Sequence, residues 1–81
     1  MTAVTVRLFA GAAEAYGAEE ATIEAATLAD VVATLARDGG PGTADVLTRC
    51  SFLVAGVRTD DPATPVPAGS TLDVLPPFAG G

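Results

Sequence analysis

The 81-residue sequence has no lysine, histidine or tryptophan and only one cysteine, Cys50. A single cysteine cannot form an internal disulfide, and it agrees with a reducing compartment. Without histidine or lysine, a nucleophile, a base and an orienting group cannot be assembled, and no Walker A or GxGxxG phosphate-binding motif is present. The sequence therefore disfavours an enzyme with its own active site, and we expect no bound cofactor.

Positive charge is scarce, because four arginines stand against ten aspartates and glutamates and give a net charge of −6. Such a field repels phosphate backbones, so nucleic acid is not an expected partner. The acidic balance indicates either a partner with a basic surface or a solvated coat that keeps the protein soluble. No apolar run approaches the roughly 20 residues of a membrane span, and residues 1–4 resemble no export signal. We expect a cytoplasmic protein that contacts no membrane.

The sequence does contain enough apolar character for one small core, since 49% of its residues are hydrophobic. A chain of this length buries about 60–65% of the surface that its unfolded form exposes. We therefore expect a single domain that folds without disulfides or metal ions, and no metal site. Residues 4–9 alternate apolar and polar side chains, which predicts a strand. Residues 10–19 hold two glycines and predict a loop, which leads to a second strand at 21–25.

The clearest predicted element is an amphipathic helix that begins after Thr27. Thr27 and Asp30 have the spacing of a capping box. Apolar residues then recur at helical spacing, at Leu28, Val31, Val32 and Leu35. Gly39 and Gly40 are predicted to form left-handed caps, and Pro41 stops the helix. Residues 43–50 are predicted to add one or two further helical turns.

Two more strands are predicted in the second half of the chain, with a short strand or a loop between them at residues 57–59. Residues 51–55 form an apolar run, and Gly56 allows a bend after it. Residues 71–75 alternate, so that Leu72 and Val74 are buried and Leu75 lies on the other face. The first and last strands are expected to form a parallel central pair, because the helix supplies the crossover.

These elements predict an α+β fold of the β-grasp, ubiquitin-like type, a mixed sheet with one main helix packed across it. The predicted domain spans residues 1–75, and residues 76–81 form a flexible C-terminal tail. The tail consists of Pro76, Pro77, Phe78, Ala79, Gly80 and Gly81. Six extended residues reach about 20 Å; two prolines stiffen the base, and two glycines remove side-chain bulk from the tip.

The tail is therefore predicted to thread into the cleft of a partner, where the carboxylate of Gly81 is activated. A carboxylate does not react with nucleophiles at neutral pH until it becomes an activated acyl group such as an adenylate. The chain has no nucleotide-binding motif, so ATP is expected on the partner enzyme. The alternative is that Gly80 and Gly81 are an ordinary frayed end.

Residues 72–81 (LDVLPPFAGG), residues 6–10 (VRLFA) and the Ala-Glu-x-x-Gly pattern of residues 13–17 resemble the ubiquitin-like sulfur carriers of the MoaD and ThiS type. The resemblance spans the whole chain. The Pro-Pro-x-x-Gly-Gly ending is most similar to MoaD, the small subunit of molybdopterin synthase. Thiazole-forming carriers are usually shorter and lack the double proline.

This resemblance implies a cycle in which an E1-like enzyme adenylates Gly81 with ATP and sulfur from a persulfide donor replaces AMP. The resulting thiocarboxylate donates sulfur for the dithiolene of molybdopterin. The chemistry is implied to take place in a MoaE-like large subunit, which binds cyclic pyranopterin monophosphate and receives the tail. Related carriers often have a basic residue within residues 11–13 for contact with the activating enzyme. Here that stretch is uncharged, and Arg7 and Arg58 are the candidates to replace it.

Strand parity predicts a partner interface at Phe9, Leu75 and Phe78. Phe9 and Leu75 both fall on the face opposite the core, and Phe78 follows closely. Adjacent exposed apolar groups often mark an interface. The alternative is that residues 10–19 cover these side chains.

Two other functions stay open. The first is a thiocarboxylate carrier for thiazole, cysteine or another sulfur pathway. The second is a ubiquitin-like modifier whose Gly81 forms an amide with a lysine of a target. Cys50 is expected to be a small buried hydrophobe, because no histidine or lysine lowers its pKa. Asp60 and Asp61 are expected to form a turn, and Tyr16 to pack within its loop. Residues 39–42 are interpreted as a helix stop and not as a phosphate-binding loop.

Overall fold

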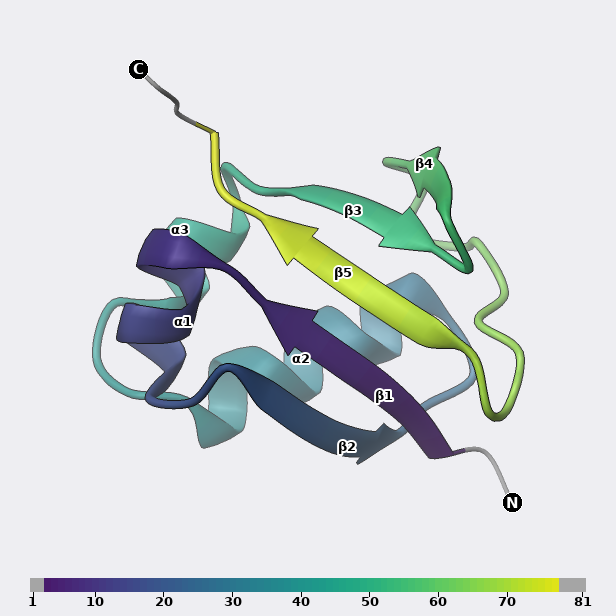
Figure 1. Cartoon of the computed structure of the whole chain (residues 1–81), viewed down its shortest axis with the longest axis horizontal. Helices are drawn as coiled ribbons and strands as arrows, with labels where there is room; N and C mark the ends of the chain where they lie inside the picture. Colours follow the sequence, from purple (N-terminus) through teal and green to yellow (C-terminus); the bar gives the residue numbers. More distant parts are fainter. Residues whose placement is uncertain (1–2, 78–81) are drawn as a thin grey trace.

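The computed structural model describes residues 3–77, in which five strands and three helices follow one another (Figure 1). In chain order these elements are β1 (Ala3–Leu8), α1 (Ala10–Tyr16), β2 (Glu20–Glu24), α2 (Leu28–Asp38), α3 (Thr43–Leu47), β3 (Ser51–Val54), β4 (Val57–Thr59) and β5 (Thr71–Leu75). The strands form one mixed sheet, and α2 is the longest of the three helices. The predicted α+β fold is confirmed.

The sheet has the strand order β2-β1-β5-β3-β4, so the first and last strands of the chain lie next to each other in its interior. They run parallel, with Val6 opposite Leu72 and Leu8 opposite Val74. All other neighbours are antiparallel. The predicted parallel central pair is confirmed, and β5 is the middle strand. This register places the apolar residues of both strands on one face, where Val6 and Leu72 have no exposed surface.

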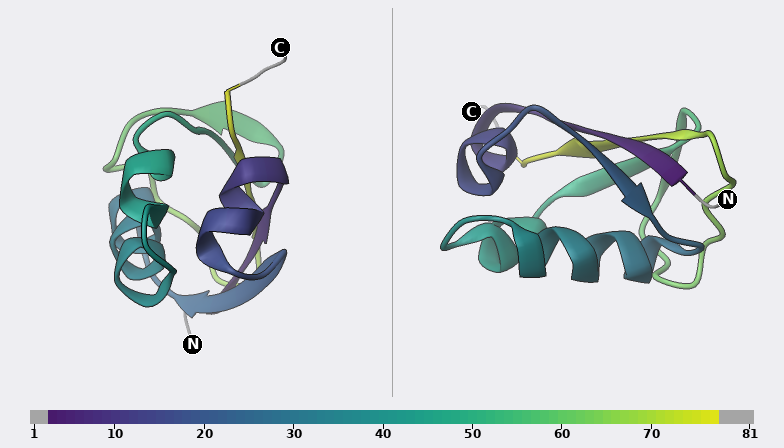
Figure 2. Two further views of the ribbon diagram at one scale, coloured as in Figure 1. Left: turned by 90° about the vertical axis from the view of Figure 1, so that its left-hand side faces the viewer. Right: turned by 90° about the horizontal axis from the view of Figure 1, so that it is seen from below.

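Helices cover one face of the sheet and leave the other face open. Figure 2 shows α2 and α3 lying beneath the sheet, with α1 at one of its ends. Helix α2 buries its apolar stripe against the strands, as predicted, through Leu28, Val31 and Leu35. Val66, from the long connection between β4 and β5, completes this core. Among residues 3–77, no helix combines the length and apolar character that crossing a membrane requires.

The predicted loop after β1 is wrong, because residues 10–16 form helix α1. Four of its seven residues are alanine, the strongest helix former, which offsets part of the cost of Gly11. Ala12 reaches the core and is 1% exposed. Gly17, the second glycine, adopts a left-handed conformation with φ of 101° and closes the helix at its C-cap.

The N-terminus of α2 agrees with the predicted cap in part. The Thr27 side chain accepts a hydrogen bond from the Asp30 N–H at 3.3 Å. The Asp30 carboxylate accepts from the N–H of Ala26 at 3.4 Å, one residue before the cap, so the reciprocal bond of a capping box is displaced.

The predicted left-handed caps at the end of α2 are wrong. Gly39 has an extended backbone with φ of −82°, and the positive φ falls on Gly42, at 89°. Glycine at positions 39 and 40 serves close packing instead. A Cβ on Gly39 would lie 2.5 Å from Thr43 Oγ1, and one on Gly40 would lie 2.8 Å from the carbonyl oxygen of Ala15. These glycines let α1 approach the link between α2 and α3.

The second half of the sheet follows the predicted strands closely. β3 ends at Val54, one residue earlier than predicted, and Ala55 and Gly56 both have positive φ and form the turn into β4. β5 has the predicted bounds, and Val74 is fully buried on the core side. Thr43–Leu47 form helix α3, which lies within the stretch 43–50 where further helical turns were predicted and ends three residues earlier.

Candidate functional site

The candidate site begins where β5 ends. Leu75 is opposite Ser51 of β3 in the last pair of that ladder. Pro76 and Pro77 follow, and neither has an N–H to extend the ladder, which is why the strand stops there. Pro76 is half-buried and Pro77 is exposed. The remaining predicted tail positions, Phe78, Ala79, Gly80 and Gly81, lie outside the described residues, and their roles stay predictions.

An apolar patch lies on the open face beside the end of β5. Phe9 is 39% exposed, and its extended backbone continues the alternation of β1, so its side chain lies opposite to that of Leu8. The Phe9 N–H donates to the carbonyl oxygen of Val74 at 3.3 Å, which ties Phe9 to the strand that carries Leu75. The structure therefore places Phe9 and Leu75 on adjacent strand ends of the same face, as predicted.

Leu53 of β3 is a third member of this patch, which the sequence analysis missed. Its neighbours Phe52 and Val54 point into the core, so Leu53 points to the open face. Leu53 and Leu75 are half-buried, and neither belongs to the core cluster. The signal was present in the alternation of β3, but residues 52–55 are a continuous apolar run, and such a run does not indicate which face of the strand is exposed. We call Phe9, Leu53 and Leu75 the open-face patch.

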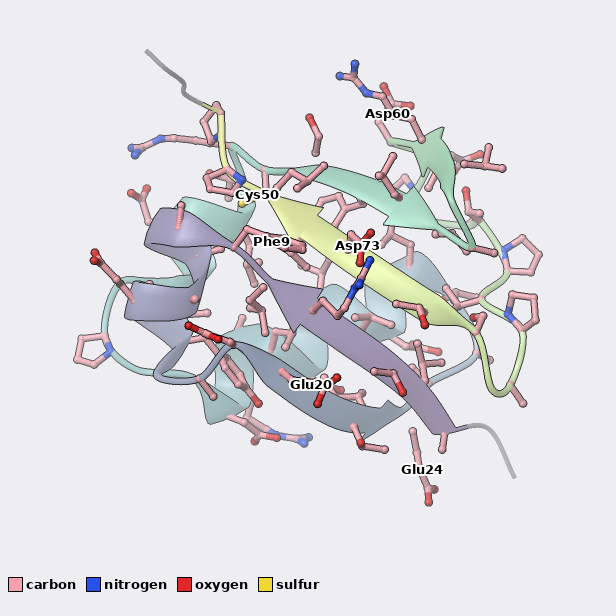
Figure 3. All side chains as sticks on the ribbon, viewed as in Figure 1. Phe9, Glu20, Glu24, Cys50, Asp60 and Asp73 are labelled. Carbon is pink, nitrogen blue, oxygen red and sulfur yellow. The ribbon has the colours of Figure 1, made fainter. Side chains whose placement is uncertain are left out.

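A row of polar side chains borders the open-face patch. The guanidinium of Arg7 donates two hydrogen bonds to the carboxylate of Asp73, at 2.7 and 2.9 Å. Arg7 also lies over the Phe9 ring, 5.8 Å from its centroid, and Figure 3 shows Phe9 and Asp73 on this face. This pair joins β1 and β5 at the point where the patch begins. Because Arg7 is engaged by Asp73, it is a poor substitute for the missing basic contact.

The other candidate for that contact, Arg58, is exposed on β4. It lies opposite Leu53, which in turn lies opposite Asp73. Within residues 3–77, Arg58 has no salt bridge. Its guanidinium is therefore available for a contact with the activating enzyme. It lies on the same open face, at the opposite edge of the sheet from β2.

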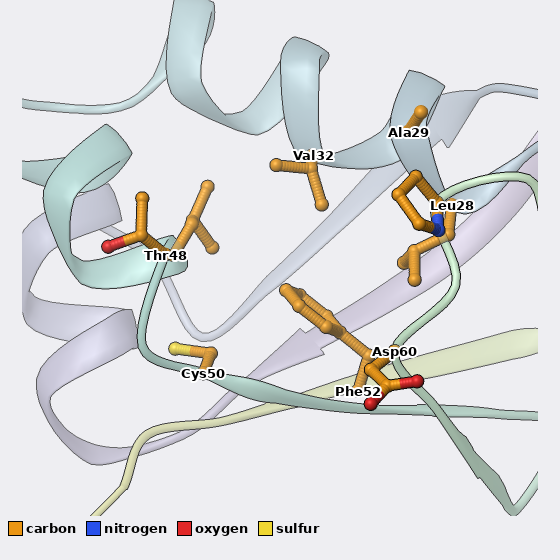
Figure 4. Close-up of a pocket in the computed structure, with 9 residues that line it drawn as sticks. Leu28, Ala29, Val32, Thr48, Cys50, Phe52 and Asp60 are labelled. Carbon is orange, nitrogen blue, oxygen red and sulfur yellow. The ribbon is translucent and has the colours of Figure 1, made fainter.

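Cys50 lies away from the open face, in a hollow of about 240 Å³ between the helices and β3 (Figure 4). The hollow is also lined by Leu28, Val32 and Phe52. The thiol is half-buried and donates to the carbonyl oxygen of Val46 at 3.3 Å. Burial raises the pKa of the Cys50 thiol, which disfavours the nucleophilic thiolate. These contacts agree with the predicted role as a small hydrophobe.

The remaining predicted residues have structural roles. The carboxylate of Asp61 accepts from the N–H of Ala63 at 2.9 Å, which is the predicted turn chemistry. Tyr16 ends α1, not a loop, and packs against the core. Among residues 3–77, no group of three or more acidic, cysteine or histidine side chains is arranged to hold a metal ion.

The fold and the open face together define a ubiquitin-like β-grasp protein. The chain belongs to the ThiS family, whose model matches residues 6–81. Membership identifies it as one of the ThiS- and MoaD-like ubiquitin-like sulfur carriers. No curated protein sequence matches the chain significantly.

Solved structures similar to this chain include one subunit of a two-subunit complex and two small archaeal modifier proteins. One is from the complex of subunits 1 and 2 of molybdopterin-converting factor from Helicobacter pylori, with 28% identity, a TM-score of 0.74, and coverage of 98% of this chain and 99% of the other. Small archaeal modifier protein 1 of Haloferax volcanii has 22% identity, a TM-score of 0.82, and coverage of 98% and 99%. The same modifier of Methanosarcina acetivorans has 22% identity, a TM-score of 0.83, and coverage of 100% and 98%. The two modifiers share the fold.

Proposed function

We propose that this chain carries sulfur on Gly81 as a thiocarboxylate and donates it as the small subunit of molybdopterin synthase. The observation that carries the proposal is the exit of the chain from β5. In a member of a sulfur-carrier family, the middle strand of the sheet leads into Pro76 and Pro77 beside the open-face patch. A partner that covers the patch is then in position to receive residues 78–81.

The chemistry is divided between this chain and an activating enzyme. A carboxylate oxygen of Gly81 attacks the α-phosphorus of ATP, and pyrophosphate leaves. The terminal sulfur of a persulfide on the partner then attacks the acyl carbon, and AMP leaves, which gives an acyl disulfide. A second thiol of the partner attacks the partner's sulfur in that disulfide, so that the Gly81 thiocarboxylate leaves and the partner keeps a disulfide. The chain contributes a carbonyl carbon with no side chain near it, because Gly80 and Gly81 have none. The E1-like partner supplies the ATP site and the persulfide.

The acceptor is proposed to be a MoaE-like large subunit. The Helicobacter pylori relative, at 28% identity, is seen in complex with subunit 2 of its molybdopterin-converting factor. The open-face patch suits such a contact, because apolar side chains on an uncovered sheet face lose water on association. Phe9 is its most exposed member. Aromatic side chains are enriched among the residues that dominate binding energy.

Intact-mass analysis of the protein purified from its own cells tests the sulfur-carrier chemistry. The expected result is a species heavier by the exchange of one oxygen for one sulfur, and a variant that lacks Gly81 should not acquire it. A native protein that stays unmodified in cells that make the cofactor would refute the chemistry. Peptides in which Gly81 is joined to a lysine side chain would instead identify a protein modifier.

A binding measurement with the large subunit tests the choice of acceptor. The double variant F9E/L75E places two charges in the open-face patch and should weaken binding at least tenfold, because each charge must be desolvated. The variant T5E/T22E is the matched control, since it adds two charges to the same face outside the patch. Equal affinities for both variants would remove the patch from the proposal. A native chain that does not bind the large subunit would favour another sulfur pathway.

A further inference from the structure

A groove lies at the end of the sheet where α1 meets β1 and β2. Its volume is about 620 Å³. Its lining combines an apolar floor with charged walls: Arg7, Leu8, Phe9, Ala10, Ala13, Glu14, Glu19 and Glu20. The small side chains of Ala10 and Ala13 leave this space open, because a longer residue at either position would fill it. Phe9 belongs to the open-face patch, so the groove is continuous with that face.

Three glutamates on separate elements carry the charge of the groove. Glu14 comes from α1, Glu19 from the connection after it, and Glu20 from the start of β2. All three are exposed, and within residues 3–77 none forms a salt bridge. The Glu19 carbonyl oxygen accepts from the Leu8 N–H at 2.9 Å, which fixes the connection against the sheet.

The one basic side chain in the groove does not neutralise these carboxylates. Arg7 lies opposite Glu20 in the β1–β2 register, but its guanidinium is directed to Asp73, to which it donates two hydrogen bonds. Arg37 and Arg49 are paired with acidic side chains elsewhere on the surface. Arg7 and Glu20 interact only through the longer-range attraction of their charges. The groove therefore presents three carboxylates that form no salt bridge within residues 3–77, beside apolar side chains.

A groove of this kind suits a particular class of occupant. The carboxylates are not gathered closely enough to hold a metal ion within the described part of the chain. They are instead placed along the walls, where a long cationic side chain can reach them while its aliphatic stem covers the alanines and the Phe9 ring. An arginine can also bond a carboxylate with two N–H groups.

We propose that this groove binds an extended segment of a partner protein in which basic and apolar side chains alternate. The basic side chains pair with Glu14, Glu19 and Glu20, and an apolar side chain packs against Phe9. Related carriers often have a basic residue of their own within residues 11–13. In this chain the positive charge is instead supplied by the partner. The inference concerns docking alone and does not depend on whether Gly81 carries sulfur.

The test is a titration of the full-length, ¹⁵N-labelled protein with an acetylated, amidated peptide of alternating arginine and leucine. A second peptide with citrulline in place of arginine has the same shape without charge. The expected result is saturable shifts of the backbone signals of Leu8, Phe9, Ala13 and Glu20 with the arginine peptide. The citrulline peptide should bind at least tenfold more weakly.

Variants that remove charge test which residues contribute to binding of the arginine peptide. The triple variant E14Q/E19Q/E20Q should weaken the arginine peptide about tenfold, because exposed ion pairs each contribute modestly. The matched control is E24Q, which removes a charge from the exposed far end of β2, outside the groove, and should change the affinity by less than about twofold. The proposal is overturned if both peptides bind equally, if the shifts map elsewhere, if the triple variant binds like the native protein, or if no binding occurs at millimolar peptide.

Discussion

Replacement of Gly39 by alanine is a direct test of the close packing among the three helices. Gly39 follows α2 with φ of −82°, a conformation that alanine adopts without backbone strain. The added Cβ, however, would lie 2.5 Å from Thr43 Oγ1, 2.8 Å from Tyr16 Cδ1 and 2.9 Å from the Leu35 carbonyl oxygen. Any effect of the substitution on stability therefore comes from this crowding.

The three neighbours cannot easily move away. Thr43 is 1% exposed, and its hydroxyl lies 2.9 Å from the Ala15 carbonyl oxygen and 2.7 Å from that of Gly40. Overpacking of a filled interior costs about 1–3 kcal/mol, and displacing the hydroxyl from its partners adds about 1 kcal/mol. Alanine recovers about 0.4–1 kcal/mol by restricting the unfolded chain. We expect G39A to lower the free energy of unfolding by about 2 kcal/mol.

Urea denaturation followed by circular dichroism measures this change, and G11A is the matched control. Gly11 lies within α1, has no positive φ, and a Cβ there would meet nothing within 4 Å. G11A should therefore raise the free energy of unfolding by about 0.5–1 kcal/mol. In a T43A background the cost of G39A should shrink, because the nearest atom is gone. If G39A were as stable as the native protein, the helices would not be packed as described.

Two further predictions concern single positions. Ala10 has φ of 49°, a region that costs an alanine about 1–2 kcal/mol relative to glycine, so A10G should raise the free energy of unfolding by about 0.5–1 kcal/mol in the same assay. A loss of stability in A10G would contradict the left-handed start of α1. Because burial raises the pKa of the Cys50 thiol, the folded chain holds this proton more tightly than the unfolded chain. The free energy of unfolding should therefore fall as pH rises through and above the ordinary thiol pKa, and less so in C50S; parallel curves for the two proteins would exclude this linkage.

Much of the site could be predicted because it depends on strand parity. Once residues 4–9 and 71–75 are assigned as neighbouring strands, the alternation of side chains places Phe9 and Leu75 on the face opposite the core. Parity does not give register, so the pairing of Arg7 with Asp73 could not be foreseen. Leu53 was missed for a related reason, since a short apolar run does not reveal which face of a strand is covered.

The groove could not be predicted, because helix α1 lines it and residues 10–16 were predicted to form a loop. Residues 10–16 contain a glycine within an alanine-rich stretch, and local preference does not decide between a loop and a short helix. The burial of Ala12 against the sheet is a tertiary contact that stabilises α1. Only after α1 forms do Glu14 and Glu20 face the same space.

Four features could be predicted from the amino-acid sequence alone: the order of the strands along the chain, the amphipathic helix, the parallel pairing of the first and last strands, and the likeness of the C-terminal residues to those of sulfur carriers. These properties follow from periodicity and local chemistry, which any short segment displays. Three other features are visible only in the folded chain: the register of the strands, the use of Gly39 and Gly40 for close approach, and the groove beside α1. Each of these depends on how separate helices and strands pack against one another, which local sequence patterns do not give.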